Sequence, residues 1–112
     1  MAEIAKEKKD KVLLITVVGE IDAGSSIFLD NALKEAMDDK EKFIAVNLTG
    51  LEYISSAGLG VFISHLDEFQ NENVKMALFG INESVREVFA ILGLEKLLKI
   101  TDTEEEAIES LQ

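Results

Sequence analysis

The sequence predicts a single α/β domain, with a mixed, mostly parallel sheet of four to five strands packed with about four helices. Short apolar runs rich in β-branched residues alternate along the chain with segments of helical periodicity. Such alternation favours parallel strands joined by right-handed helical crossovers. The 112 residues suffice for one core, and no Pro, linker or repeat divides them, so residues 1–112 are expected to form one domain.

The composition excludes several functional classes. The net charge is -11, with 22 acidic against 11 basic residues, so the surface repels a phosphate backbone and direct nucleic-acid binding is not expected. The absence of Cys removes disulfides, thiolate metal sites and thiol nucleophiles. The longest apolar run, residues 12–18, is far shorter than the ~20 residues of a membrane helix. We therefore expect a cytoplasmic protein with no membrane partner.

The chain is expected to begin with a β-hairpin. A short strand over residues 3–8 precedes a buried, β-branched strand over residues 12–18 that ends at Gly19. Lys9 and Asp10 form the turn between the two strands. Because strands joined by a tight turn are antiparallel, this hairpin makes the predicted sheet mixed.

The first helix begins at Ser25 or Ser26, where the period of the apolar residues changes. Asp22, which follows the preceding strand, is expected to cap this helix. One apolar face is formed by residues at helical spacing, namely Leu29, Ala32, Leu33, Ala36 and Met37.

Another short apolar strand is predicted over residues 43–48, and it is followed by a turn and a second helix. The helix closes in the polar segment of residues 71–73. His65 is interpreted as a boundary residue on its flank. Its inward face comprises Leu59, Phe62, Ile63, Leu66 and Phe69.

A third core strand covers residues 74–79 and ends at Gly80. Asn82 then caps a third helix, and Gly93 stands where a left-handed C-terminal cap belongs. The residues of this helix expected to face inward are Val85, Val88, Phe89 and Leu92.

The chain closes with a strand around residues 97–101 and a short helix. Thr103 and Glu106 have the spacing of a capping box at the start of this helix. Glu104 and Glu105 add favourable negative charge at the same end. The helix is expected to bury Ala107, Ile108 and Leu111.

The most informative segment is Tyr53-Ile54-Ser55-Ser56-Ala57-Gly58-Leu59-Gly60, which places two hydroxyls between a strand and an apolar helix. Ser before a helix most often acts as an N-cap. The same position can bind an anion or carry a phosphate, because several N–H groups there lack partners and the helix dipole favours negative charge. Sites in α/β sheets gather beyond the carboxyl ends of strands, where this segment is expected to lie.

Enzyme chemistry finds little support in the chain. The pair Gly58 and Gly60 lacks the third Gly of a dinucleotide fingerprint, since position 63 is Ile, and no phosphate-binding loop motif occurs. Ser56 and His65 are separated by ~14 Å along one helix, too far for a hydrogen bond. The acidic clusters read as solvated turns and helix starts. We predict no catalytic residue, no cofactor and no metal site.

These residues together resemble the STAS domain family, and specifically the bacterial anti-sigma factor antagonists. The segment Gly19-Glu20-Ile21-Asp22 is similar to the family's Gly-x-Leu/Ile-Asp turn, and residues 44–60 are similar to its strand, turn and helix. The similarity extends over nearly the whole chain, including residues 74–80 and 97–103. Two positions depart from the typical pattern, because Ser55 and Asn47 stand where the family often has Asp.

The resemblance implies a regulatory binding module. By position, Ser56 matches the serine that a partner kinase phosphorylates in such antagonists. The unmodified protein would bind a serine-kinase anti-sigma factor and release the sigma factor, phosphorylation would end the complex, and a serine phosphatase would reset it. The implied contact residues are Asp22, Ser55, Ser56, Ala57, Gly58, Leu59 and Gly60. The alternative is a STAS module without phosphorylation, acting as an accessory subunit of a transporter or as a signalling scaffold.

Overall fold

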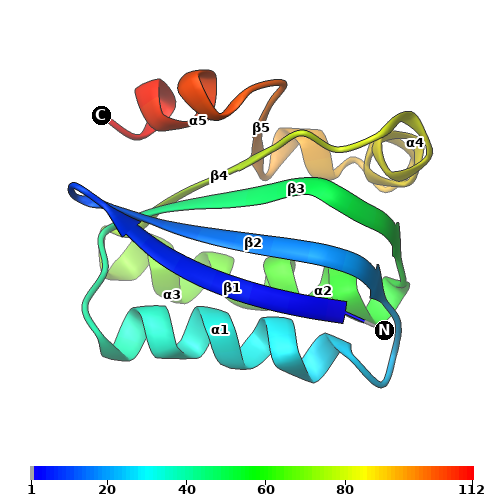
Figure 1. The fold of residues 1–112 in the computed structure, drawn as a ribbon, viewed down its shortest axis with the longest axis horizontal. Coiled ribbons are helices and arrows are strands. Elements are labelled where there is room, and N and C mark those ends of the chain that lie inside the picture. Colours follow the sequence, from blue (N-terminus) through cyan, green and yellow to red (C-terminus); the bar gives the residue numbers. More distant parts are fainter. Residues whose placement is uncertain (1) are drawn as a thin grey trace.

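The computed structural model describes residues 2–112 and contains one five-stranded sheet (Figure 1). The strands are β1 (Ala2–Lys9), β2 (Val12–Ile21), β3 (Phe43–Ile54), β4 (Lys75–Phe79) and β5 (Lys99–Thr101). They lie side by side in sequence order; β1 is antiparallel to β2, and every other neighbouring pair is parallel. The predicted mixed, mostly parallel sheet is confirmed.

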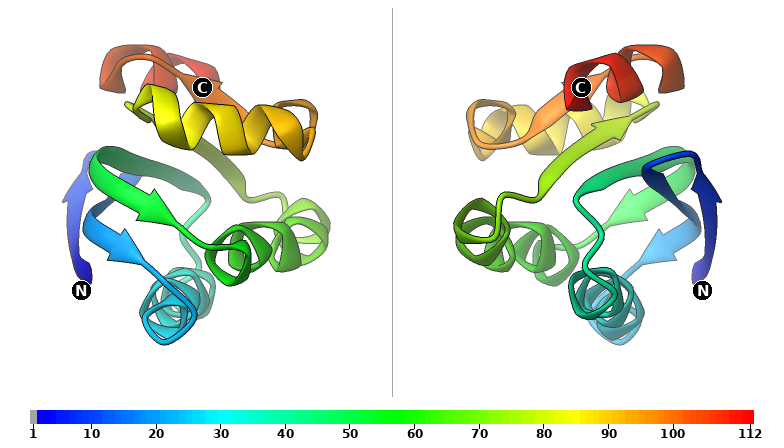
Figure 2. Two further views of the ribbon diagram at one scale, coloured as in Figure 1. Left: turned by 90° about the vertical axis from the view of Figure 1, so that its right-hand side faces the viewer. Right: turned by 90° about the vertical axis from the view of Figure 1, so that its left-hand side faces the viewer.

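Helices cover both faces of this sheet. They are α1 (Ser26–Asp38), α2 (Ser56–Ser64), α3 (Leu66–Asn71), α4 (Glu83–Ile91) and α5 (Glu104–Leu111), with a 3-10 turn η1 (Leu94–Lys96). Figures 1 and 2 show α1, α2 and α3 on one face and α5 on the other. The N-terminal end of α4 is tied to the end of β3, because the Asn82 side-chain amide donates to the carbonyl of Leu51 over 3.1 Å. Within residues 2–112, no helix combines the length and apolar character required to cross a bilayer.

The two faces of the sheet have separate apolar clusters, as alternating side chains require. Leu13 and Ile15 of β2 belong to the larger cluster, which α1, α2 and α3 cover. Val12 and Leu14 point to the opposite face and pack with Ala107 and Leu111 of α5. The central strands are therefore buried on both sides, which explains their nearly continuous apolar runs.

Strands β2 and β3 extend further than the sequence predicted. Gly19 does not end β2; it has a φ of 99° and lies at an irregularity in the register. Beyond it, Gly19 pairs with Leu51 and Ile21 with Ile54, so both strands continue through residues that resemble a turn in sequence. The predicted ends at Gly19 and Leu48 were wrong because long-range pairing overrides local composition.

The predicted second helix is divided at His65 into α2 and α3. Three residues assigned to inward faces are exposed, with exposed fractions of 41% for Ile63, 37% for Val88 and 54% for Leu92. Leu92 lies just beyond the end of α4, and Val88 flanks the buried stripe made by Val85 and Phe89. For these three positions the predicted burial was wrong.

The predicted caps of the later elements are confirmed. The N–H of Val85 donates to the side chain of Asn82 over 2.8 Å at the start of α4. Gly93 has a φ of 70°, the left-handed conformation expected after a helix. Thr103 and Glu106 form both hydrogen bonds of a capping box.

Candidate functional site

Parallel pairing of β2 and β3 brings two sequence-distant turns together at the carboxyl ends of these strands. The N–H of Ser55 donates to the carbonyl of Ile21 over 2.8 Å, beside the last paired residues of the two strands. Figure 2 (left) is viewed toward these carboxyl ends, where β2 leads into α1 and β3 into α2. The Asp22 turn and the turn of residues 55–58, here called the serine turn, are therefore neighbours. This agrees with the expectation that sites gather beyond the carboxyl ends of strands.

The serine turn opens α2 with Ser55 as the N-cap. Ser55 is extended, and its Oγ accepts the N–H of Gly58 over 3.2 Å. Ser56 is the first residue of the helix, and its side chain is exposed. Within the described residues, the N–H groups of Ser56 and Ala57 have no hydrogen-bond partner. Free donors at a helix start therefore lie next to the Ser56 hydroxyl.

The Asp22 turn is stabilised by reciprocal hydrogen bonds between Asp22 and Ser25. The carboxylate of Asp22 accepts the N–H and the hydroxyl of Ser25 over 2.8 and 2.9 Å, while Ser25 Oγ accepts the N–H of Asp22 over 2.9 Å. The N–H of Ser26 donates to the carbonyl of Asp22. The N-cap position of α1 is Ser25, so the prediction that Asp22 caps this helix was wrong; the Asp22 carboxylate fixes the turn that precedes it. Because these bonds stabilise the carboxylate, the pKa of Asp22 lies below its usual value.

Replacing Ser25 with Ala should raise the pKa of Asp22 toward its ordinary value, since one donor to the carboxylate disappears. A depressed native pKa stabilises the fold above the unfolded pKa, and the effect is lost as pH falls through the native value. An NMR titration of the Asp22 carboxyl carbon measures the shift. Ser26→Ala is the control, because that hydroxyl donates to Ala23 instead. Identical titration curves for wild type and Ser25→Ala would contradict the assignment.

The predicted contact residues in and after the serine turn divide into exposed and buried positions. Ser56, Ala57 and Gly60 are exposed, whereas Leu59 has an exposed fraction of 2% and packs into the core. The prediction of Leu59 as a contact residue was wrong, because its side chain faces inward. Gly58 is also buried, and a Cβ there would lie 2.6 Å from Ile21 Cγ2. It permits close packing of α2 on the strands instead of forming surface.

The exposed face of α2 carries no charge. Its residues recur at helical spacing and are Ser56, Ala57, Gly60, Ile63 and Ser64. Charged residues make up 29% of the chain, yet α2 contains none. The central part of a protein interface is depleted in charged residues, and this face shares that property.

His65 forms a buried contact that the sequence analysis did not predict. Its Nε2 lies 2.8 Å from Asp30 Oδ1, and its ring packs on Phe69 with a centroid separation of 5.5 Å. His65 has an exposed fraction of 7%, so its interpretation as a boundary residue was wrong. The contact joins α1 to the break between α2 and α3. Nothing local in the sequence signals it, because the partners are 35 residues apart.

Asp30 therefore has two side-chain partners, His65 and Lys34. Its pKa is lowered first by the hydrogen bond from Lys34 and then by that from His65. Lys34 Nζ lies 2.9 Å from Asp30 Oδ2 one helical turn away, but the Lys34 side chain is 61% exposed. The buried contact with His65 is thus expected to contribute more to stability than the ion pair with Lys34, since exposed ion pairs contribute little.

Asp30→Ala should lower the free energy of unfolding by about 1–3 kcal/mol, because it leaves the buried His65 nitrogen without its partner. Lys34→Ala, which removes only the exposed ion pair, should cost less than about 1 kcal/mol. Urea denaturation of both variants measures the difference. Equal losses in the two variants would show that the His65 contact adds nothing.

Two arrangements that catalytic sites often use were compared with the described residues. Among residues 2–112, no group of three His, Cys, Asp or Glu side chains could hold a metal ion. His65 bonds to Asp30 and stands at the opposite end of α2 from Ser56, so these two residues do not form a nucleophile and base pair.

Known proteins resemble this chain in sequence and in fold. The model of the STAS domain family matches residues 3–107. The anti-sigma-B factor antagonist of Listeria monocytogenes serovar 1/2a is 30% identical over 101 residues, which cover 90% of this chain and 89% of the relative. The anti-sigma factor antagonist of Mycobacterium paratuberculosis has a TM-score of 0.90 at 21% identity, with 99% of this chain and 94% of that chain covered. The phosphorylated form of the Bacillus cell fate determinant SpoIIAA has a TM-score of 0.73 at 22% identity, with 98% and 100% covered.

Proposed function

The chain belongs to the STAS domain family, and we propose that it acts as an anti-sigma factor antagonist controlled by phosphorylation of Ser56. The unmodified protein binds a serine-kinase anti-sigma factor, which then releases its sigma factor. The kinase transfers the γ-phosphoryl group of ATP to Ser56 Oγ, ADP is left, and the complex separates. The observation that carries the proposal is an exposed Ser56 at the head of a helix whose exposed face has no charge.

The unmodified surface suits a closely packed partner. Ser56, Ala57 and Gly60 are small, so the backbone of α2 can approach another protein closely. The neighbouring Asp22 carboxylate is exposed and held in place by Ser25, which supports a role in orienting the partner. Ser55 and Gly58 contribute by fixing the shape of the turn.

Ser56 fits the role of phosphate acceptor better than Ser55 does. The Oγ of Ser55 already accepts the N–H of Gly58, and its side chain is half-buried. Transfer to Ser55 would disrupt the N-cap of α2, whereas the exposed Ser56 hydroxyl has no hydrogen bond within the described residues. The family's usual Asp is absent here, but a serine N-cap does the same hydrogen-bonding work.

Phosphate at this position should spare the fold and disrupt the interface. It adds about -1.5 to -2 charge near neutral pH. The free N–H groups at the start of α2 can donate hydrogen bonds to the phosphate oxygens. The first turn of α2 contains no acidic residue that would repel the phosphate. In the complex, however, the same charge must lose its water against a surface shaped for a small hydroxyl.

The proposed module is a regulator and not an enzyme. Its partners are a serine-kinase anti-sigma factor and a serine phosphatase, and we place all three in the cytoplasm. The net charge of -11 argues against direct contact with DNA or RNA. Sigma-factor release therefore follows from competition for the kinase.

Affinity capture from a lysate of the native organism tests this function. Wild-type, Ser56→Ala and Ser56→Glu baits are compared, with bound proteins identified by mass spectrometry. We expect an ATPase of the histidine-kinase type with the first two baits and not with the third. Equal capture by all three baits, or recovery of transporter subunits in place of the ATPase, would contradict the proposal.

A further inference from the structure

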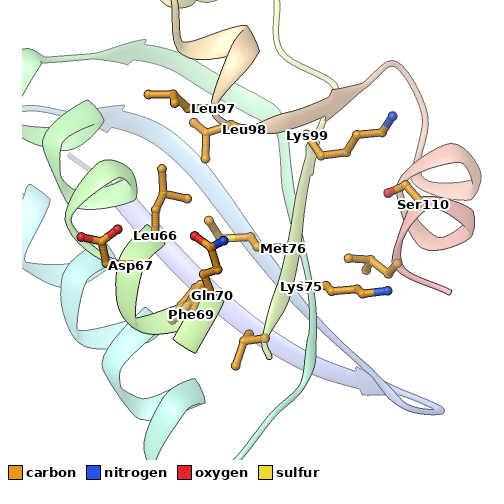
Figure 3. Close-up of a pocket in the computed structure, with 12 residues that line it drawn as sticks. Leu66, Asp67, Phe69, Gln70, Lys75, Met76, Leu97, Leu98, Lys99 and Ser110 are labelled. Atoms are coloured by element: carbon orange, nitrogen blue, oxygen red, sulfur yellow. The ribbon is translucent and has the colours of Figure 1, made fainter. Parts of the chain in front are cut away.

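A groove of about 670 Å³ lies at the open edge of the sheet, between α3 and the C-terminal end of α5 (Figure 3). Leu66 and Phe69 of α3 form part of one wall, and Met76 of β4 lies between that wall and the strand edge. Lys75 and Lys99 line the side nearer α5. The groove is at the amino end of β4, whereas the serine turn follows the carboxyl end of β3.

The groove exists because β5 is shorter than β4. Strand β3 pairs with β4 along residues 75–79, but β5 pairs only with residues 77–79. The 3-10 turn η1 and the bend at Leu98 occupy the chain just before β5. Within the described residues, Lys75 and Met76 therefore have a strand neighbour on one side only. An uncovered strand edge is a template for pairing with another extended segment.

The two sides of this edge differ in chemistry. Met76 and Leu98 pack against the larger apolar cluster, on the α3 face. Lys75 lies on the α5 face, because it is two residues before Ala77, which packs with α5. Lys99 pairs with Ala77 and shares that face. Figure 3 shows both ammonium groups directed toward α5 and the Leu66 and Phe69 side chains on the other side of β4.

Lys75 and Lys99 are among several lysines that form no ion pair within the described residues, and Lys11 and Lys40, outside the groove, are others. Lys6, Lys8, Lys9, Lys34 and Arg86 each form an ion pair with a carboxylate. Neither Lys75 nor Lys99 has an ion-pair partner among the described residues, although the chain has a net charge of -11. The one carboxylate that lines the groove, Asp67, is on α3. The edge of β4 thus presents two free cations beside an apolar wall.

We propose that this edge binds an extended segment of another protein, which pairs with residues 75 and 76 of β4. Side chains of a strand alternate between faces, so the segment that fits has apolar residues toward Met76 and Leu98 and acidic residues toward Lys75 and Lys99. A second copy of this chain fits less well, since symmetric pairing would bring like charges together. The surface is separate from the serine turn and does not depend on the phosphorylation of Ser56.

Amide-resolved NMR with short capped peptides tests the proposal. One peptide alternates Val and Glu, and the control alternates Val and Lys. The acidic peptide should shift the amide signals of Lys75, Met76 and Leu98 and leave those of the serine turn unchanged. Its binding should weaken by about tenfold or more in Lys75→Glu/Lys99→Glu, where attraction becomes repulsion.

The matched control is Lys11→Glu/Lys40→Glu, which changes the net charge equally at exposed lysines outside the groove. This variant should retain most of the affinity of wild type. The proposal is overturned if the acidic peptide causes no shifts at millimolar concentration, if the Val-Lys peptide causes the same shifts, or if both double variants bind equally. A wild-type dimer paired through Lys75 and Met76 would also overturn it, because the occupant would then be a second copy.

Discussion

Ser56→Glu is expected to weaken binding of the proposed anti-sigma kinase by about a thousandfold, which corresponds to ~4 kcal/mol. The side chain of Ser56 is exposed on an uncharged helix face, so the carboxylate would have to be desolvated wherever the partner packs closely. The same charge is favourable for the isolated helix, because it lies at the N-terminus of α2. Isothermal titration of each variant with the captured kinase measures the loss.

Two controls separate the interface from the fold. Ser56→Ala keeps the surface small and uncharged and should bind within about tenfold of wild type. Circular dichroism and the urea midpoint should be nearly the same for wild type, Ser56→Ala and Ser56→Glu. A Ser56→Glu protein that binds like wild type would remove the electrostatic basis of the switch, and one that unfolds would show that the turn does not tolerate charge.

Gly58→Val is expected to destabilise the fold by about 1–3 kcal/mol or more through overpacking. A Cβ at Gly58 would lie 2.6 Å from Ile21 Cγ2 and 2.7 Å from Ile54 Cγ1. These two Ile residues are the last residues of β2 and β3, and their side chains are buried. Relief requires α2 to move away from the sheet, which shifts Ser56 relative to Asp22. Urea denaturation measures the stability, and titration with the kinase measures the consequence for binding.

Gly60→Val is the matched control, in the same helix and two residues away. A Cβ at Gly60 meets no atom within 4 Å, and Val is a slightly better helix former than Gly. Its stability should remain within about 0.5 kcal/mol of wild type. Because Gly60 is on the exposed face, the added side chain should instead weaken kinase binding. Wild-type stability in Gly58→Val would contradict the packing described here.

Local patterns predicted much of the fold, because the forces behind them act over a few residues. The caps at Ser55, Asn82 and Thr103 each depend on a hydrogen bond within three residues. Those at Asn82 and Thr103 were predicted by residue, and a serine cap was predicted before α2 without a choice between Ser55 and Ser56. The final residues of β2 and β3 depend instead on pairing between strands 33 positions apart, such as Ile21 with Ile54. Local composition could not specify those ends.

The geometry of the candidate site was predicted in part, and the differences between prediction and structure have physical causes. Helical periodicity placed Leu59 inward, while the family motif suggested it as a contact residue; the structure agrees with the periodicity. The His65–Asp30 contact and the open edge at Lys75 depend on how distant segments pack. Neither leaves a pattern within a short stretch of sequence.

Phosphoryl transfer tests the central claim most directly. The captured kinase and radiolabelled ATP are incubated with wild-type protein, Ser55→Ala and Ser56→Ala, and the label on each protein is measured and mapped. Transfer to Ser56 in wild type and in Ser55→Ala, with none to Ser56→Ala, is the result predicted here. Label on Ser56→Ala equal to that on wild type, or no label on any protein that binds the kinase, would contradict control of this module through Ser56.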